Sequence, residues 1–131
     1  MARTRSPQHP LSGLTIFLLE DNPLICLDLD ASLQDLGATV RSTNSLEAAL
    51  AIVQIERLDC AVLDFDLHGR TSEPVAERVQ QKGVPFLFLS GYGENDGHFA
   101  RWPDITILVK PIAVTTIAAA IERLLGRESS A

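Results

Sequence analysis

Several features that would place this sequence in a special class of protein are scarce or missing. Only two cysteines occur among 131 residues, and Cys26 and Cys60 both lie inside apolar patterns, as expected for small core residues in a reducing cytoplasm. No cluster of ligand residues surrounds them, which argues against a metal site or a disulfide. No apolar run approaches the roughly 18 residues of a membrane span, and nothing before Leu14 resembles a signal peptide. We therefore expect a cytoplasmic protein without a membrane partner.

Positive charge is also scarce. The chain has 11 Lys and Arg against 17 Asp and Glu, a formal net charge of −6. Binding to nucleic acid requires a concentrated basic face, whereas the basic residues here are scattered and the pair Arg3 and Arg5 lies in an expected tail. We therefore expect no nucleic-acid partner. The length and the 46% hydrophobic content suit one domain with a single well-buried core.

Apolar runs alternate with helical patterns along the chain. Continuous apolar runs of this kind are typical of strands that are covered on both faces. The expected strands are residues 14–19, 38–42, 60–63, 85–89 and 105–109. The expected helices begin at Asn22-Pro23, at a capping-box spacing of Asn44 and Glu47, near Val75, and near Val114, and the first has an inward stripe of Ile25, Leu29, Leu33 and Leu36.

The ends of the chain and one internal segment do not follow this alternation. Residues 1–12 are expected to be a flexible N-terminal tail, residues 13–126 the folded domain and residues 127–131 a C-terminal tail. Residues 91–104 contain three glycines and a proline, so a fourth helix there should be short, about Glu94 to Arg101, or partly disordered. Trp102 is expected to pack the end of this segment, with contact to a partner as the alternative.

Polar residues that could take part in a reaction stand at the ends of four expected strands. They are Glu20 and Asp21, Asp64, Ser90, and Lys110. Strands that alternate with helices form a parallel sheet with helices on both faces, and such sheets carry their chemistry beyond the carboxyl ends of the strands. The fold should therefore bring these residues together.

The set matches the needs of an aspartate that accepts a phosphoryl group. Glu20, Asp21 and Asp64 offer clustered oxygen ligands suited to Mg²⁺, which would neutralise charge between the carboxylate and the phosphoryl group. Lys110 would contact one phosphoryl oxygen, and the Ser90 hydroxyl with the Gly91 N–H would contact another. Pro111 is a candidate for a cis peptide bond that turns Lys110 over the pocket.

Each of these residues also has a purely structural explanation. Acidic residues at strand ends often serve as turns or caps, Ser90-Gly91 alone is a common turn, and a single Asp at a strand end is more often structural than nucleophilic. Their joint occurrence, in this order and each at the end of a strand, favours the functional interpretation.

The arrangement resembles the receiver domain of two-component response regulators over roughly residues 14–125. The resemblance implies a flavodoxin-like, doubly wound α/β fold whose five-stranded parallel sheet has the order 2-1-3-4-5. It also implies phosphorylation of Asp64, dependent on Mg²⁺, by a histidine kinase or a histidine phosphotransfer protein. The main-chain carbonyl of Asp66 would be a further metal ligand, beside Glu20, Asp21 and Asp64.

One departure from the family pattern and one closer resemblance bear on how this chain would signal. The aromatic residue that reports phosphorylation stands three residues before the lysine in the family, and here that position is Ile107. The stretch from Pro85 to Gly93 resembles the FAT GUY subgroup, whose kinases are often of the HWE type. In this family Asp66 and Tyr92 would line the mouth of the pocket and tune the lifetime of the phosphoryl group; for Tyr92 the alternative is a packed loop aromatic. His68 is expected to be a solvated loop residue, with the ordering of water or contact with a partner as the alternative.

These observations predict a stand-alone response regulator that signals by protein–protein contact, because the chain ends soon after its last helix. It would not be a turnover enzyme beyond self-phosphorylation and slow autodephosphorylation. One alternative is a receiver-like interaction module that never uses its phosphate, which the residue at position 107 keeps open. The other is a phosphatase of the haloacid dehalogenase type, because Asp64-Phe-Asp66 has the Asp-x-Asp form of those enzymes.

Overall fold

Five parallel strands form the central sheet of this protein. The computed structural model describes residues 8–91 and 97–127. The strands are β1 Thr15–Leu19, β2 Thr39–Thr43, β3 Cys60–Asp64, β6 Phe86–Ser90 and β7 Thr106–Val109, and their spatial order is β2-β1-β3-β6-β7. Counted along the chain, this is the order 2-1-3-4-5, so the predicted flavodoxin-like topology is confirmed.

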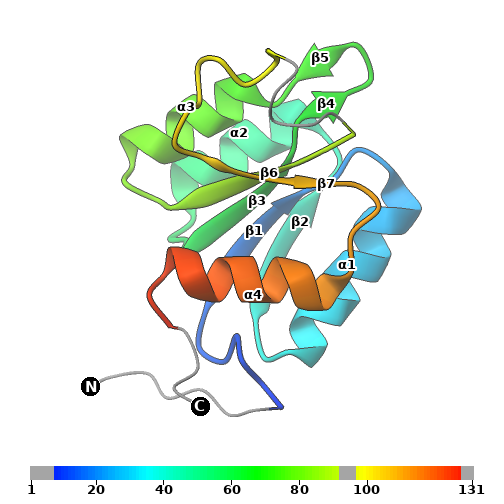
Figure 1. Ribbon diagram of the computed structural model, residues 1–131, viewed down its shortest axis with the longest axis vertical. Coiled ribbons are helices and arrows are strands. Elements are labelled where there is room, and N and C mark those ends of the chain that lie inside the picture. Colours follow the sequence, from blue (N-terminus) through cyan, green and yellow to red (C-terminus); the bar gives the residue numbers. More distant parts are fainter. Residues whose placement is uncertain (1–7, 92–96, 128–131) are drawn as a thin grey trace.

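Helices cover both faces of the sheet (Figure 1). Helices α1 (Pro23–Asp35) and α4 (Val114–Leu124) pack on one face, and α2 (Leu46–Ile55) and α3 (Glu73–Gln81) pack on the other. The longest, α1, has 13 residues. Across residues 8–91 and 97–127, no helix has the length and apolar character needed to cross a membrane.

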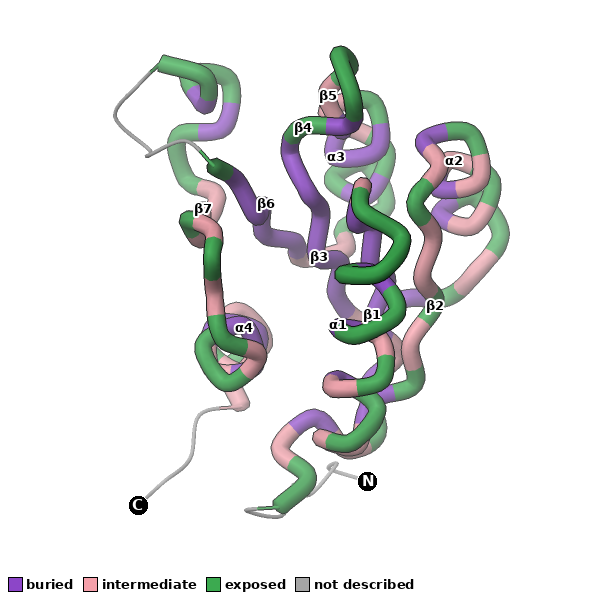
Figure 2. The backbone as a smooth tube through the Cα atoms, turned by 90° about the vertical axis from the view of Figure 1, so that its right-hand side faces the viewer, coloured by how far each residue is buried: buried purple, intermediate pink, exposed green. Residues whose placement is uncertain are grey.

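The core is divided into two layers by the sheet. All residues of β3 and β6 are buried (Figure 2), which is why their sequences are continuous apolar runs. Alternate side chains point to opposite faces: Phe17 and Phe88 pack toward α2 and α3, while Ile16 and Leu89 pack toward α1 and α4. Both cysteines are buried and free of disulfides, as predicted.

The inward face of α1 differs from the predicted stripe. Ile25 is 44% exposed, and Cys26, Leu29 and Leu33 are the buried residues. The helix begins at Pro23, and the Asn22 side chain caps it by accepting hydrogen bonds from the backbone N–H groups of residues 24 and 25. The spacing from Cys26 to Leu33 continues the helical repeat, so the small thiol fills the position that the pattern had given to Ile25.

Helix α2 is capped by Ser45 and not by Asn44. The Ser45 hydroxyl accepts a hydrogen bond from the Ala48 N–H at 3.2 Å. The predicted capping box of Asn44 and Glu47 is therefore wrong by one residue. Glu47 instead forms an ion pair with Arg70.

Ser45→Ala should lower the free energy of unfolding by about 1 kcal/mol, because the N–H of Ala48 would lose its partner. Asn44→Ala, at an exposed position, should change it by less than about 0.5 kcal/mol. Urea denaturation of both variants measures the difference. Equal losses in the two variants would contradict the assignment of the cap.

The segment between β6 and β7 contains turns and no helix within residues 97–104. Residues 92–96, which include Tyr92 and the first part of the predicted fourth helix, lie outside the described residues. Phe99 and Trp102 are each only 4% exposed and join the core layer under α2 and α3. Trp102 thus packs the end of the segment, as predicted.

The folded part of the chain includes the last residues of the predicted N-terminal tail. Leu11 is fully buried, and its N–H donates to the carbonyl of Leu36 at 2.9 Å. Gly37 has a φ of +102°, and a Cβ there would lie 3.0 Å from the backbone of Ser12. Arg127 donates to the carbonyl of Ser12 at 3.0 Å. Packing therefore extends from residue 11 to residue 127.

Candidate functional site

The carboxyl ends of the central strands bring the predicted residues to one edge of the sheet. Glu20 directly follows β1, Asp64 and Ser90 end β3 and β6, and Lys110 follows β7. The backbone N–H of Lys110 donates to the carbonyl of Ser90 at 2.7 Å. Glu20, Asp64 and Ser90 are all buried, with exposures of 0%, 4% and 1%.

Lys110 bridges the two buried carboxylates. Its Nζ lies 2.9 Å from Asp64 Oδ1 and 3.0 Å from Glu20 Oε1. Burial alone would disfavour both negative charges. The single ammonium group therefore compensates for charge on both side chains, and it places a cation directly at Asp64 Oδ1.

Burial and mutual proximity shift the pKa values of Asp64 and Glu20. Burial, together with the hydrogen bond and negative charge of Glu20, raises the pKa of Asp64 to about 7, although Lys110 opposes the shift. For Glu20, burial acts to raise the pKa, but hydrogen bonds from Asp64 and Lys110 outweigh it and lower the pKa. Below about pH 7 the pair therefore retains one proton.

Asp21 lies on the solvent side of this pair. Its backbone N–H donates to Asp64 Oδ2 at 3.2 Å, and its carboxylate is 23% exposed. His68 Nδ1 contacts Asp21 Oδ2. His68 is therefore not only a solvated loop residue, although its side chain is 79% exposed.

A small hairpin carries His68 to Asp21. Strands β4 (Asp66–Leu67) and β5 (Arg70–Thr71) pair antiparallel. The two residues between them, His68 and Gly69, have φ angles of 48° and 85°, as a type I′ turn requires. The sequence predicts only a loop here. Gly69 after His68 was the available signal, but two-residue strands give no periodicity to detect.

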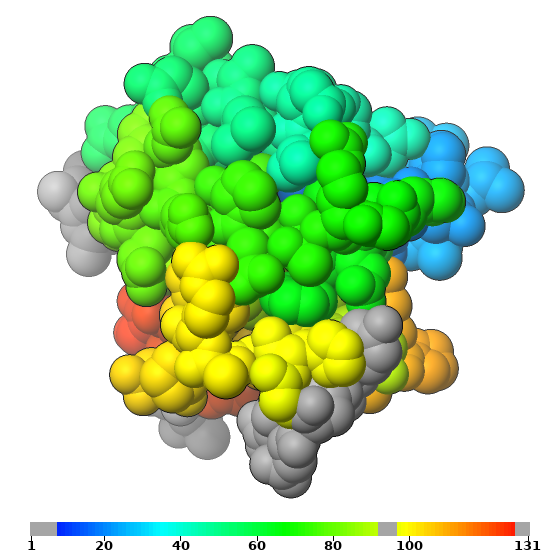
Figure 3. Space-filling view, turned by 90° about the horizontal axis from the view of Figure 1, so that it is seen from above, coloured from blue at the N-terminus to red at the C-terminus, as the bar shows by residue number. Residues whose placement is uncertain are grey.

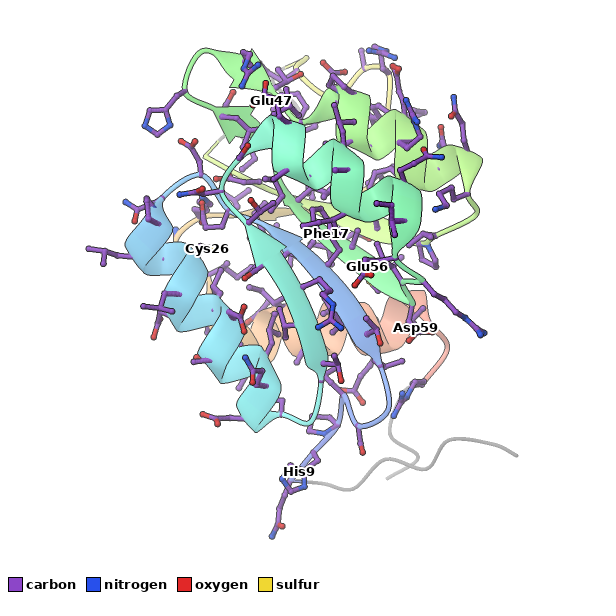
Figure 4. All side chains as sticks on the ribbon, turned by 180° about the vertical axis from the view of Figure 1, so that it is seen from behind. His9, Phe17, Cys26, Glu47, Glu56 and Asp59 are labelled. Carbon is purple, nitrogen blue, oxygen red and sulfur yellow. The ribbon has the colours of Figure 1, made fainter. Side chains whose placement is uncertain are left out.

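The hairpin is held against α2 by Arg70. Its guanidinium donates to Glu47 Oε2 at 2.8 Å, and Glu47 lies beside the hairpin at the start of α2 (Figure 4). This ion pair is exposed, and its contribution to stability is on the order of 0–1 kcal/mol. Its effect is local, because it fixes where the tip of the hairpin lies relative to Asp21.

The oxygen donors at this edge fit Mg²⁺. The backbone of Asp21 adjoins the Asp64 carboxylate, the Asp21 carboxylate is partly exposed, and hard oxygen ligands with room for water suit this ion. Glu20 is turned toward Lys110. Accordingly, in the described parts of the chain no three His, Cys, Asp or Glu side chains converge as a formed metal site.

The remaining predicted residues surround this centre. Gly91 is exposed next to buried Ser90, and the Asp66 side chain is exposed on the hairpin. The Lys110–Pro111 peptide bond is cis. Tyr92 lies outside the described residues, so the structure does not place it.

A cleft of about 450 Å³ opens beside the site, between α1 and the residues after β7. Glu20 and Lys110 form its polar end, and the rest of its wall is mainly apolar, including Ile25, Leu29, Leu89, Pro111 and Ile112. On α1, next to this cleft, Leu24 and Leu27 are 78% and 70% exposed. Ile25 on the same helix is 44% exposed, so apolar side chains of α1 remain accessible beside the cleft.

The sequence profile of the response regulator receiver domain matches residues 16–122. The phyllosphere-induced regulator PhyR of Methylorubrum extorquens is 27% identical over 120 residues, which cover 88% of this chain and 45% of PhyR. The chain thus spans about half the length of this curated relative.

Solved structures agree with this match. SdrG from Sphingomonas melonis Fr1 is 33% identical, with a TM-score of 0.68 over 88% of this chain and 98% of SdrG. The receiver domain of the sensor histidine kinase PA1611 from Pseudomonas aeruginosa, with magnesium in its active-site cleft, has 21% identity and a TM-score of 0.75 over 88% of this chain and 99% of its own. The chain belongs to the response regulator receiver domain family of two-component signalling.

Proposed function

We propose that this receiver accepts a phosphoryl group on Asp64 from a phosphohistidine and signals through protein–protein contact. The observation that carries the proposal is the placement of Lys110 Nζ at 2.9 Å from Asp64 Oδ1, at the carboxyl edge of a parallel sheet. The proposed donor is a histidine kinase, with the HWE type as its class, or a histidine phosphotransfer protein. The exposed apolar side chains of α1, next to the cleft, suit contact with such a protein.

In the proposed reaction an oxygen of ionised Asp64 attacks the phosphorus atom. A P–O bond forms, the P–N bond to the donor imidazole breaks, and the leaving nitrogen takes up a proton. Because the pKa of Asp64 lies at about 7, part of the population is protonated at neutral pH and cannot attack. Mg²⁺, held by Asp21, Asp64, the Asp66 carbonyl and Glu20, would favour the ionised form and neutralise charge between the reacting groups.

The other side chains then have separate roles. Lys110 would move from Glu20 and Asp64 to a phosphoryl oxygen, which its flexible stem permits. The Ser90 hydroxyl and the Gly91 N–H would bind a second oxygen. Asp66 and Tyr92 are proposed to control the lifetime of the phosphoryl group by steering water at the mouth of the pocket.

Intact mass measurement after incubation with acetyl phosphate and Mg²⁺ tests the proposal, with Asp64→Asn as the matched variant. We expect one phosphoryl group on the wild type and none on the variant or without Mg²⁺. A label that persists on the variant would identify another acceptor. A wild type that takes no label from acetyl phosphate or from a phosphorylated histidine kinase would refute the proposal.

His68→Ala should tighten Mg²⁺ binding about two- to fivefold. The imidazole contacts Asp21 Oδ2. A largely exposed pair of this kind contributes on the order of 0–1 kcal/mol, and Mg²⁺ must displace it to bind that oxygen. Calorimetric titration with Mg²⁺ measures the change, and His9→Ala, far from the site, is the control. Weaker binding in His68→Ala would mean instead that His68 orients Asp21 for the metal.

One observation favours a second function, an interaction module that signals without phosphate. Ile107 is half-buried in β7 where the family places its reporting aromatic residue. Under that function, Asp64→Asn would leave affinity for the output partner unchanged. Receiver domains are in general not turnover enzymes, so membership of the family leaves no support for the phosphatase interpretation of Asp64-Phe-Asp66.

A further inference from the structure

The segment that stands where a fourth helix was expected is fastened to the chain that follows Asp64. We call residues 64–73 the acceptor loop and residues 97–104 the linking segment. In Figure 3 the linking segment, in yellow, lies against the green of α3. Two separate contacts join the linking segment to the acceptor loop, one aromatic and one polar.

The aromatic contact begins at the residue directly after Asp64. The ring centroids of Phe65 and Phe99 are 4.5 Å apart, and Phe65 also packs edge-on against Phe88 at 5.2 Å. Phe65 is 2% exposed. Its backbone N–H donates to the carbonyl of Leu89 at 2.8 Å, and its carbonyl accepts from Ser72 at 2.9 Å. The ring is therefore held firmly between the site and the linking segment.

The polar contact is centred on Glu73, in the first turn of α3. Glu73 Oε2 accepts hydrogen bonds from Trp102 Nε1 at 2.9 Å and from Arg101 at 3.2 Å, and Oε1 accepts from the Thr71 hydroxyl at 3.1 Å. Arg101 also pairs with Glu77 at 2.7 Å. The hydrogen bond from the buried indole to a carboxylate is charge-assisted and therefore stronger than one between neutral groups. We call it the Glu73–Trp102 clamp.

The positions of these contacts give a route from the acceptor to the surface. Phosphorylation of Asp64 adds volume and negative charge directly beside Phe65, in a core that is close-packed and transmits displacement. The Ser90–Gly91 step, proposed to turn toward the phosphoryl group, leads along the chain into the linking segment. Both changes act on the linking segment, in which Trp102 is hydrogen-bonded to Glu73. Ile107 is aliphatic, so this chain has no aromatic ring at that position whose rotation could report phosphorylation.

We propose that the Glu73–Trp102 clamp restrains the linking segment while Asp64 is unmodified, and that phosphorylation releases it through Phe65 and Phe99. This inference rests on the proposed function. Release would make Phe99 and Trp102 accessible beside β7, where a protein partner could bind them. The clamp is thus an autoinhibitory contact, and breaking it should favour the phosphorylated form by the same free energy that it contributes to the unmodified form.

Trp102 is the only tryptophan in the chain, so its fluorescence reports the clamp directly. Beryllium fluoride with Mg²⁺, a stable mimic of the phosphoryl group, should shift the wild-type emission to longer wavelength as the indole meets water. Glu73→Gln should show part of this shift without the mimic. It should also bind the mimic about three- to tenfold more tightly, because the charged hydrogen bond no longer opposes release.

Two variants serve as controls. Glu77→Gln removes the other partner of Arg101 but leaves the Trp102–Glu73 hydrogen bond intact. Because Arg101 lies 5.4 Å from the centroid of the Trp102 ring, the control is read from the affinity for the mimic, which should equal that of wild type. Asp64→Asn should abolish the response. Trp102→Phe keeps the ring packing but removes the indole N–H, and it should be labelled faster by acetyl phosphate than wild type in the mass assay.

The outcomes separate the two proposals. A wild type that is labelled on Asp64 but shows no change in Trp102 emission would overturn the clamp alone, as would equal or weaker binding of the mimic by Glu73→Gln. A wild type that takes neither label nor mimic would overturn the proposed function, and the clamp with it.

Discussion

Asp64→Asn is expected to stabilise the folded protein at neutral pH, by about 2–4 kcal/mol in the absence of Mg²⁺. The side chain of Asp64 is almost fully buried beside Glu20, and this environment raises its pKa to about 7. The asparagine oxygen can take the place of Asp64 Oδ1 as the acceptor for Lys110, whereas its NH2 group takes the place of Oδ2, which accepts the 3.2 Å hydrogen bond from the Asp21 N–H. The variant therefore keeps the contact with Lys110, loses one long hydrogen bond, and removes the cost of holding a proton or a second negative charge there.

The sign of the pH dependence follows from the direction of the shift. Asp64 has a pKa near 3.8 in the unfolded chain and about 7 in the folded one. Between these values the folded state binds more protons than the unfolded state, so stability falls as pH rises from about 4 to about 7. The advantage of Asp64→Asn should therefore be close to zero near pH 4, grow through this window and be complete above pH 7.

Urea denaturation of wild type and variant at a series of pH values measures this difference, and thermal unfolding at neutral pH should show a Tm higher by roughly 10 °C. Asp104→Asn, an exposed replacement of the same kind, should have no such effect. Addition of Mg²⁺ should narrow the gap, because it stabilises only the wild type. A variant advantage that is constant from pH 4 to pH 8 would show that the pKa of Asp64 is not raised.

The position of the site was predictable because it depends on topology. Apolar runs mark strands, alternation with helices makes the sheet parallel, and parallel strands end at one edge. Glu20, Asp64, Ser90 and Lys110 each follow or end such a run, so their meeting did not require knowledge of side-chain conformations. The order of the strands came from the resemblance to receiver domains and not from the runs themselves.

What could not be predicted depends on contacts between side chains far apart in sequence. Helical periodicity did not distinguish Ile25 from Cys26 as the inward residue of α1. The two residues are neighbours in the sequence and both are apolar, so either of them can begin the same inward stripe. Glu20 meets Lys110, 90 residues away, through a choice of rotamer. The Glu73–Trp102 hydrogen bond likewise joins a helix start to an irregular segment. No local pattern encodes these pairs.

The tip of the hairpin shows a further limit. His68 was expected in solvent, and its side chain is largely exposed, yet it contacts Asp21. Exposure and contact are compatible when both partners lie at the rim of a site. Only the turn geometry at His68 and Gly69 determines which way the imidazole points.

Lys110→Met is expected to lower the free energy of unfolding by about 3 kcal/mol at pH 7 to 8, the largest loss among these substitutions. Methionine replaces the stem of the lysine but leaves Glu20 and Asp64 buried without a cation. Both carboxyl groups would then favour the protonated form. The folded variant would hold an extra proton, so its stability should fall more steeply with rising pH than that of wild type.

A double-mutant cycle separates this loss from a simple loss of packing. In the Asp64→Asn background, Lys110→Met should cost less, because only the Glu20 carboxylate remains to be compensated. Lys82→Met is the matched control: its Nζ donates to the neutral carbonyls of Val53 and Gln54, so its cost should be about 1 kcal/mol and independent of pH. If the cost of Lys110→Met were the same in both backgrounds and at every pH, Lys110 would be a packing residue. Its positive charge would then not explain why the two carboxylates of Glu20 and Asp64 can lie together at this buried edge.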